Sequence, residues 1–229
     1  MESDPLLPGP GRDRAVRHMF DRIAGRYDRV NRVLTFGLDG GWRRRAVAAL
    51  ELPPGSLVLD VGCGTGGLCR LLETAGHRAV GVDMSEGMLR AAAPGLRLVL
   101  ADGLRLPLPP GSVDGATCGF ALRNMVDPAA LFTELARVLR VGGRFTLLEV
   151  AEPSWQPARA VHGLYFRRVV PLVGGALSDR RAYSYLPRST SLLPSPADFA
   201  TMVAGAGFTG FRRRMLGLGA AQLLEATRA

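Results

Sequence analysis

The chain has 229 residues, of which 47% are hydrophobic and 21% charged, and its formal net charge is +9. This length suits one α/β domain with a sizeable core and is short for two, and the composition is that of a globular protein. No apolar run approaches the roughly 20 residues that a membrane-spanning helix needs. All 29 basic residues are arginine. The basic surface that they form is either simply solvated or attracts nucleic acid or an anionic membrane face.

The start of the chain is rich in proline and glycine and has no period, so we predict that residues 1–14 are disordered and residues 15–229 form one domain. It is also acidic where a signal peptide would be basic and then apolar. The three cysteines include no C-x-x-C pair. We therefore expect a cytoplasmic protein without disulfides or a metal site. The sequence does not decide whether the protein also contacts the inner face of the cell membrane or forms a homodimer.

Apolar, β-branched segments alternate with helical patterns through the middle of the chain. We predict strands at residues 56–61, 79–84, 97–102, 112–122 and 144–150. One helix is expected at 67–76, and another from Pro128, capped by Asp127, to the glycines at 142 and 143. Strands joined by helices in this way form a parallel sheet through right-handed crossovers.

The two ends of this unit carry additions. Residues 15–34 place apolar side chains at steps of three and four, so we expect N-terminal helices within 15–50. Residues 151–194 are irregular and rich in arginine, aromatics, proline and glycine, and they read as an insertion that covers the substrate. A capped helix at 195–206 and two strands within 208–228 follow, and the strands predict a closing antiparallel hairpin.

The first predicted strand runs into a glycine loop, VLDVGCGTGG at residues 58–67. Gly62, Gly64 and Gly67 satisfy the G-x-G-x-x-G spacing of a dinucleotide site. A dinucleotide presents an anionic pyrophosphate to such a loop, whereas S-adenosylmethionine has no phosphate and carries a sulfonium and an ammonium. Asp60, two residues before the first glycine, would face such a cation and repel a pyrophosphate, so it favours the methyl donor.

Acids also end the next two strands. Asp83 lies about 20 residues beyond the loop, where a carboxylate accepts hydrogen bonds from both ribose hydroxyls of an adenosine ligand. Asp102 ends the third strand, where it would accept from the adenine amino group. The carboxyl ends of parallel strands share one edge of the sheet, so these acids predict one adenosine site there.

Longer stretches carry a resemblance to a known family. They are MFDRIAGRYDRVNRVLTFGLDGGWRR (19–44), GFALRNMVDP (119–128), RVLRVGGRFTLLEV (137–150) and YFRRVVPLVGGALSDRRAYSYLPRS (165–189). With the glycine loop they resemble class I S-adenosylmethionine-dependent methyltransferases, and more closely the C-methyltransferases of menaquinone and ubiquinone biosynthesis. The resemblance covers nearly the whole chain and implies a Rossmann-like, mostly parallel seven-stranded sheet with a C-terminal antiparallel hairpin and an N-terminal helical attachment.

The resemblance and the acid positions together predict the cofactor site. The predicted contacts are Tyr27, Asp60, Gly62, Gly64, Thr65, Gly66, Asp83, Met84, Asp102, Gly103 and Gly119. Many family members carry serine where this chain has Gly119, and Ala121 replaces a glycine of the same run. The implied cofactor is S-adenosyl-L-methionine, with S-adenosyl-L-homocysteine as its product.

The implied reaction methylates a ring carbon of a demethylated polyprenyl quinol. The resemblance indicates demethylmenaquinol as this acceptor. The carbon becomes nucleophilic when the adjacent phenolic oxygen loses its proton. The guanidinium of arginine stays protonated and cannot act as a base. Arg123 is therefore predicted to stabilise the oxyanion, with Asn124 orienting the same oxygen. An ion pair between Arg123 and Asp127 is the structural alternative, and His162 is the candidate proton acceptor.

Other functions stay open on the sequence alone. A methyltransferase of the same fold could act on a soluble phenolic or polyketide-like metabolite, since fold does not fix substrate. The literal glycine spacing would suit a dehydrogenase, against which Asp60 argues. No recognisable nucleic-acid-binding motif is present, so we expect no nucleic acid partner. Residues 158–177 could form a lid or rest on anionic headgroups.

Overall fold

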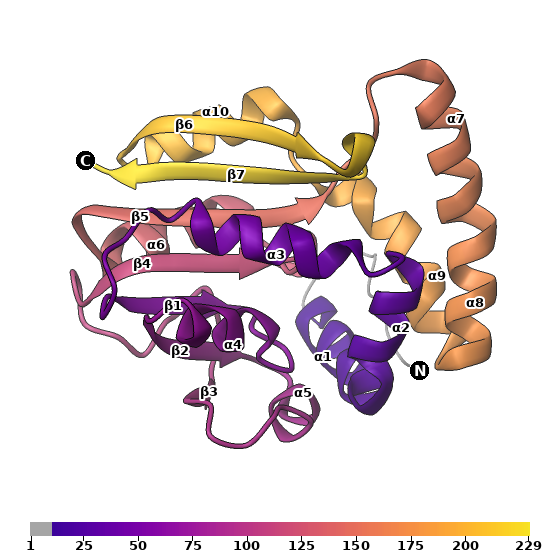
Figure 1. Cartoon of the computed structure of the whole chain (residues 1–229), viewed down its shortest axis with the longest axis horizontal. Coiled ribbons are helices and arrows are strands. Elements are labelled where there is room, and N and C mark those ends of the chain that lie inside the picture. Colours follow the sequence, from indigo (N-terminus) through magenta and orange to yellow (C-terminus); the bar gives the residue numbers. More distant parts are fainter. Residues whose placement is uncertain (1–10) are drawn as a thin grey trace.

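The computed structural model of the chain describes residues 11–229. A seven-stranded sheet runs through its centre in the order β3-β2-β1-β4-β5-β7-β6 (Figure 1). The strands are β1 (Leu57–Val61), β2 (Arg78–Asp83), β3 (Leu98–Leu100), β4 (Val113–Gly119), β5 (Leu139–Val150), β6 (Phe208–Leu216) and β7 (Ala221–Arg228). Neighbouring strands from β3 to β5 are parallel, and β7 is antiparallel to both β5 and β6. This confirms the predicted sheet and its closing hairpin.

Helices lie on both faces of the sheet and at one of its edges. The helices are α1 (Arg12–Ile23), α2 (Tyr27–Leu34), α3 (Leu38–Ala48), α4 (Gly67–Thr74), α5 (Glu86–Arg90), α6 (Pro128–Val138), α7 (Gln156–Leu164), α8 (Val170–Leu177), α9 (Arg180–Ser189) and α10 (Pro196–Gly205). A π-helical turn at Tyr165–Val169 joins α7 to α8, and short 3-10 turns lie at Ala24–Arg26, Leu122–Asn124, Thr190–Leu192 and Gly217–Gly219. Helices α3 and α4 cover one face, and α6 and α10 the other (Figure 1).

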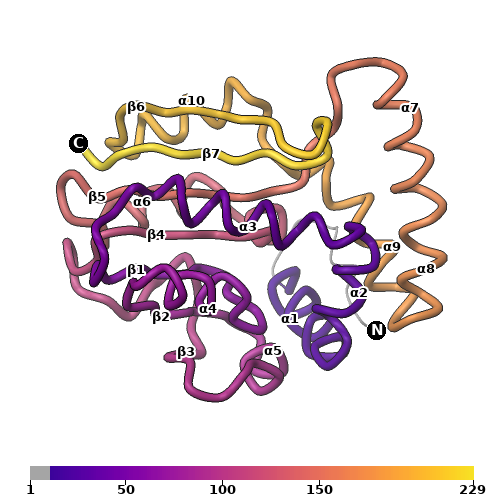
Figure 2. Tube along the Cα trace, in the orientation of Figure 1, coloured from indigo at the N-terminus to yellow at the C-terminus, as the bar shows by residue number. Residues whose placement is uncertain are grey.

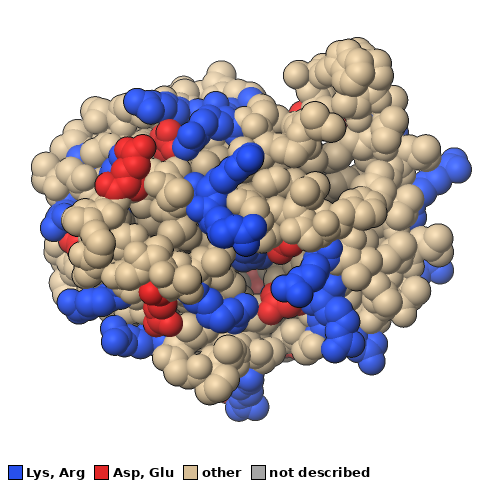
Figure 3. Space-filling view, in the orientation of Figure 1, with Lys and Arg blue, Asp and Glu red and all other residues tan. Residues whose placement is uncertain are grey.

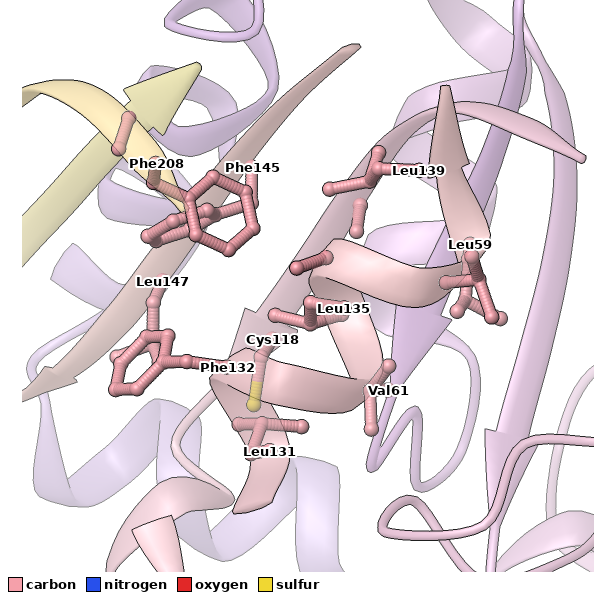
Figure 4. Close-up of a cluster of buried hydrophobic side chains, with 14 of the residues drawn as sticks. Leu59, Val61, Cys118, Leu131, Phe132, Leu135, Leu139, Phe145, Leu147 and Phe208 are labelled. Atoms are coloured by element: carbon pink, nitrogen blue, oxygen red, sulfur yellow. The ribbon is translucent and has the colours of Figure 1, made fainter. Parts of the chain in front are cut away.

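The largest apolar core lies between the sheet and the α6 and α10 face. Phe132 of α6 packs against Phe145 of β5 with ring centroids 5.6 Å apart (Figure 4). Phe199 of α10 meets Phe132 edge to face at 6.5 Å. Each buried side chain of this size contributes ~1.5–3 kcal/mol. The two helices begin as predicted, since Asp127 caps α6 and Ser195 opens α10 with a capping box.

A second helical layer lies beyond the carboxyl ends of the parallel strands. It is built from α1 and α2 near one end of the chain and α7, α8 and α9 from the other half, which lie side by side at the right of Figure 2. These helices share an apolar cluster of their own, which includes Val16, Met19, Ile23, Val170 and Tyr183. We call this layer the cap. It places helices from distant parts of the sequence over the edge where ligands bind in open α/β sheets.

The start of the domain differs from the prediction. Residues 1–10 of the segment expected to be disordered lie outside the described residues, but α1 already begins at Arg12 instead of residue 15. The Arg12 guanidinium is buried and donates hydrogen bonds to the carbonyl oxygens of Arg123 (3.0 Å) and Met125 (3.2 Å). Contacts more than 100 residues away in the sequence therefore hold this end of the helix, and no local pattern could indicate them.

Two further expectations about secondary structure are wrong. The helix after Asp127 ends at Val138, and β5 begins at Leu139 and runs through both glycines, with a register shift against β4. Residues 151–194 are mostly helical, with Pro171 in the first turn of α8 and Pro187 inside α9. Their tertiary packing within the cap overrides weak local propensities.

Candidate active site

A cavity of ≈ 100 Å³ lies at the carboxyl edge of the parallel strands, beneath the cap. We call it the first cavity. Its walls come from the loops after β1 to β4 and from α1 and α2. The lining residues are Asp13, Val16, Phe20, Tyr27, Gly62, Gly64, Val82, Asp83, Met84, Met88, Asp102, Gly103, Leu104, Gly119, Phe120, Ala121, Asn124, Met125 and Val126. All three charged side chains among them are acidic, so the first cavity suits a cation and opposes a pyrophosphate.

The glycine loop forms the floor of the first cavity through its backbone. Gly62 has φ of 66°, and a Cβ on it would lie 2.4 Å from the Cβ of Ala121. Only glycine meets both conditions at this position. At Gly119 a Cβ would lie 2.7 Å from Leu68 Cδ1. Leu68 thus fills the space that a side chain at 119 would need, and residue 119 offers a ligand only backbone.

Asp83 ties this loop to the next one along the edge. Its Oδ2 accepts a hydrogen bond from the Gly64 backbone N–H and its Oδ1 one from the Ser85 N–H, both at 2.8 Å. Burial raises the pKa of Asp83, and the backbone N–H groups oppose that shift. A carboxylate has about four acceptor positions, so Asp83 can hold two donors in place and still accept from a ligand's hydroxyls. Asp102 similarly accepts the Leu104 N–H at 2.9 Å and is otherwise exposed.

Three predicted cofactor residues are not brought to the first cavity. Asp60 is 1% exposed, because the alternation along β1 turns it toward α4; there Thr117 Oγ1 donates to it at 2.8 Å and Cys69 Sγ lies at 3.6 Å. Burial raises the pKa of Asp60 to about 7. Thr65 and Gly66 are also absent from the cavity wall. The expectation that Asp60 faces a bound cation is therefore corrected: its carboxyl is buried between β4 and α4.

Two acids of the cap hold the same loops from above. Asp21 Oδ1 of α1 accepts hydrogen bonds from Ser85 Oγ at 2.6 Å and from the Gly87 N–H at 2.9 Å. Asp28 of α2 accepts from Thr65 Oγ1 through both carboxylate oxygens, at 2.8 and 2.9 Å. The cap therefore closes the first cavity by fixed polar contacts with the loops after β1 and β2.

A second cavity of ≈ 210 Å³ adjoins the first. Phe20, Tyr27 and Phe120 line both cavities, so the two cavities meet at these side chains. The second cavity is lined by Met19, Phe20, Ile23, Tyr27, Asn31, Leu34, Thr35, Phe36, Leu38, Asp39, Trp42, Arg43, Phe120, Arg123, Val150, His162, Tyr165, Phe166, Val170, Ala182, Tyr183, Tyr185, Leu186 and Ala220. This mostly apolar, aromatic lining suits a ring with a hydrocarbon substituent.

Arg123 lies in the wall of the second cavity and is 6% exposed. Its Nη1 donates to Glu149 Oε1 and to the Phe120 carbonyl oxygen, both at 2.6 Å. Burial alone would lower the pKa of Arg123, but the Glu149 carboxylate, together with Tyr27 and Tyr185, more than offsets this, and the pKa lies above the usual value. The ion-pair partner is therefore Glu149 and not Asp127, which caps α6.

Asn124 and Tyr185 connect the two cavities. Asn124 lines the first cavity and Tyr185 the second, and the Tyr185 hydroxyl donates to Asn124 Oδ1 at 3.1 Å. His162 of α7 also lines the second cavity, with its ring stacked on Phe166 at 4.4 Å. Burial lowers the pKa of His162, so its imidazole is neutral and able to accept a proton near pH 7. Of the three predicted catalytic residues, Arg123 and His162 thus line the second cavity, and Asn124 lines the first.

Comparisons with known proteins give the family. The model of the ubiE/COQ5 methyltransferase family matches residues 10–228. The chain belongs to this family. It is 42% identical to a demethylmenaquinone methyltransferase of Roseiflexus sp. (strain RS-1), over 96% of this chain and 97% of that protein. It is 39% identical to a ubiquinone/menaquinone biosynthesis C-methyltransferase of Syntrophotalea carbinolica, over 96% of each chain.

Solved structures agree on the fold of this methyltransferase. A protein from Thermotoga maritima described as a possible histamine N-methyltransferase superposes with a TM-score of 0.67, at 22% identity, over 93% of this chain and all of that one. The fold is that of class I methyltransferases, as predicted, and the methyl donor of the family is S-adenosylmethionine.

The residues of the first cavity fit this donor. Its acidic lining complements a sulfonium and an ammonium, Asp83 has acceptor positions that ribose hydroxyls would use, and Val82, Met88 and Leu104 provide apolar surface on which adenine would pack. The donor supplies an electrophilic methyl group when bound. Of the predicted contacts, Tyr27, Gly62, Gly64, Asp83, Met84, Asp102, Gly103 and Gly119 line the cavity.

Sequence reasoning missed the contribution of α1 to this site. Asp13, Val16 and Phe20 line the first cavity, and Asp13 falls in the segment expected to be disordered. The apolar period of α1 was visible in the sequence, but it does not say against what the helix packs. Met88, Leu104 and Met125 were also missed, since apolar side chains in a ligand slot resemble ordinary core residues.

Proposed function

We propose that this methyltransferase methylates a ring carbon of a demethylated polyprenyl quinol, with demethylmenaquinol as the acceptor and menaquinol as the product. The observation that carries the proposal is the second cavity, which is apolar and aromatic, contains a buried arginine and shares a wall with the donor cavity. The names of relatives at about 40% identity, which refer to demethylmenaquinone and to menaquinone biosynthesis, support the same acceptor.

The chemistry follows from the residues of the second cavity. A ring carbon attacks only when the adjacent hydroxyl is ionised, so a positive group beside that oxygen lowers the barrier. Arg123 supplies this charge, and Asn124, held by Tyr185, orients the oxygen. The neutral imidazole of His162 takes the hydroxyl proton. The aromatic wall formed by Phe20, Tyr27 and Phe120 aligns the ring with the donor and excludes water.

We also propose that the cap rests on the cytoplasmic face of an anionic membrane, where a polyprenyl substrate resides. No helix within residues 11–229 is long and apolar enough to cross a bilayer. Large apolar side chains are nevertheless exposed: Phe36, between α2 and α3, is 79% exposed, Trp155, just before α7, 70%, and Leu218, between β6 and β7, 94%. The corner over α7 carries few charged side chains in the view of Figure 3. In this reading residues 158–177 act as both lid and lipid contact.

The reaction can be tested directly. Labelled methyl transfer from S-adenosylmethionine to chemically reduced, short-tailed demethylmenaquinone in detergent should place the label in the quinone. Arg123→Ala should lower this rate about 100- to 1000-fold, as loss of an oxyanion-stabilising group does. Because Ala leaves Glu149 buried without its partner, Arg123→Lys, which keeps the charge, is measured beside it, and binding of S-adenosylhomocysteine shows that each variant is folded.

Two outcomes would contradict the proposal. If the protein binds S-adenosylhomocysteine but labels no quinol, the acceptor is wrong and a soluble phenolic or polyketide-like metabolite takes its place. If both Arg123 variants bind the product and keep full activity, the acceptor stands and the role of Arg123 is wrong.

A further inference from the structure

The second cavity holds polar atoms that the protein itself leaves unsatisfied. Within residues 11–229, buried side-chain nitrogen or oxygen atoms without a hydrogen-bond partner occur on six residues, and three of these, Arg123, His162 and Tyr183, line the second cavity. The atoms are Arg123 Nε, His162 Nε2 and the Tyr183 hydroxyl oxygen. Unpaired buried polar groups are rare in folded proteins, because each has lost its water. Their concentration in one cavity indicates that a ligand completes them.

Tyr183 is the member of this set that the proposed chemistry does not use. It lies on α9 and is 3% exposed. Its ring is packed so closely on α8 that a Cβ at Gly174 would lie 2.2 Å from Tyr183 Cγ. The ring is therefore fixed in place. Burial raises the pKa of Tyr183 well above its usual value, so its hydroxyl stays protonated and can donate.

Two of the three other tyrosines of the second cavity give a contrast. The Tyr165 hydroxyl donates to the Leu34 carbonyl oxygen at 2.7 Å, and the Tyr185 hydroxyl donates to Asn124 at 3.1 Å. Both are thus satisfied within the protein. The unsatisfied Arg123 Nε and the unsatisfied Tyr183 hydroxyl thus belong to residues that line the same cavity, which is also the cavity of the proposed oxyanion site.

We propose that the Tyr183 hydroxyl donates a hydrogen bond to the second ring oxygen of the acceptor, the one para to the oxygen that Arg123 stabilises. This inference rests on the proposed function and adds to it a residue that determines acceptor specificity. A quinol carries two such oxygens on opposite sides of its ring, whereas a simple phenol carries one. Tyr183 thereby makes the site selective for rings with two oxygens and fixes which carbon faces the donor cavity.

The test compares two acceptors that differ by one oxygen. One is a short-tailed demethylated 1,4-naphthoquinol, and the other is the matching 1-naphthol, which lacks the oxygen at position 4. The wild-type enzyme should prefer the quinol in kcat/KM. Tyr183→Phe should lower kcat/KM for the quinol about tenfold, mainly through KM, since one hydrogen bond is lost, and should leave kcat/KM for the naphthol unchanged.

Tyr165→Phe is the matched control. It removes a hydroxyl from the same cavity, but one that is already bonded to backbone, so it should change both acceptors by the same factor. Binding of S-adenosylhomocysteine, which occupies the first cavity, should be unaltered by Tyr183→Phe.

The outcomes separate the two proposals. If Tyr183→Phe slows both acceptors equally, or changes neither, the specificity role is overturned while the quinol reaction stands. If the wild-type enzyme methylates neither acceptor although it binds S-adenosylhomocysteine, the quinol function itself is overturned, and the role of Tyr183 with it.

Discussion

Asp60 shows how a single buried carboxyl can accept hydrogen bonds from β4 and α4 at a cost to stability. Its pKa is raised from 3.8 to about 7, chiefly by burial, and hydrogen bonds from Thr117 and Cys69 and the charge of Arg43 oppose the shift, while Asp83 adds to it. The unfolded chain therefore releases this proton near pH 4, whereas the folded protein keeps it until near pH 7. Folding stability consequently falls as pH rises between these values, by ~4 kcal/mol in total.

Asp60→Asn should remove this pH dependence, since asparagine does not ionise and its oxygen can still accept from Thr117. Relative to the wild type, the variant should gain stability progressively between pH 5 and pH 8. Urea unfolding of both proteins at pH 5, 6, 7 and 8 measures the difference. A difference that is the same at every pH would show that Asp60 is ionised in the folded protein throughout this range.

The site residues that could be predicted are those fixed by local backbone geometry. Glycines at the loop and acids at strand ends follow from the β-α-β pattern, so Gly62, Asp83 and Asp102 were found. Asp60 was misplaced because a strand-end acid can face either side of the sheet, and only the position of α4 decides which. Glu149, the buried partner of Arg123, gave no signal, since its neighbours in β5, Leu147, Leu148 and Val150, are apolar and indicate only a buried strand end.

At the scale of elements, α1 is the part of the cap most directly coupled to the donor cavity. It lines the cavity and reaches the loop before α5 through Asp21, which accepts from Ser85 and from the Gly87 backbone. These contacts keep the loop that carries Asp83 in place. Donor affinity should therefore depend on a residue of α1 that does not line the cavity.

Asp21→Asn weakens both contacts by removing the charge of the acceptor. We expect the dissociation constant of S-adenosylhomocysteine to rise about tenfold, which corresponds to the loss of roughly 1.5 kcal/mol from charged hydrogen bonds. Isothermal titration calorimetry gives the value. Asp198→Asn is the control, because it disrupts the capping box of α10 and should lower stability by ~1 kcal/mol without changing affinity. Unchanged affinity in Asp21→Asn would mean that α1 does not hold the site closed.

The elements that sequence could not predict are those defined by distant contacts. The parallel strands, α4 and α10 have strong periods and clear caps, and they lie where expected. The helices α7 to α9 carry glycine and proline within them, and they are stable because Val170, Tyr183 and their neighbours pack against α1 and α2. Likewise, β5 pairs with β4 at Leu139 and again from Arg144 onward, so the strand continues through a glycine pair that resembles a helix stop.

At the scale of the whole molecule, the cap gives the protein two unlike ends. Beyond the carboxyl ends of the parallel strands lie the cavities and the exposed apolar side chains, together with Arg29, Arg32, Arg167 and Arg168, which are exposed and make no ion pair within residues 11–229. Exposed apolar groups ringed by unpaired cations suit an anionic bilayer surface. The backbone supports this reading, since Phe36 and Leu218 have φ of 52° and 57°, a conformation that large side chains rarely adopt and that commonly marks a functional position.

Leu218→Asn tests the membrane contact without disturbing the fold, because asparagine tolerates positive φ better than leucine does. Wild-type protein should sediment with vesicles containing phosphatidylglycerol, less with pure phosphatidylcholine, and less at high salt. The variant should bind about tenfold more weakly, as expected when burial of one leucine is lost. Val141→Asn changes a side chain that is 78% exposed in the β5 segment at the other end of the sheet, and it should bind like the wild type. If the wild type binds neither kind of vesicle, or if both variants bind equally well, the cap does not contact the membrane. The exposed apolar side chains then contact only the hydrocarbon tail of the substrate. In that case, activity toward a short-tailed quinol in detergent should be the same in all three proteins.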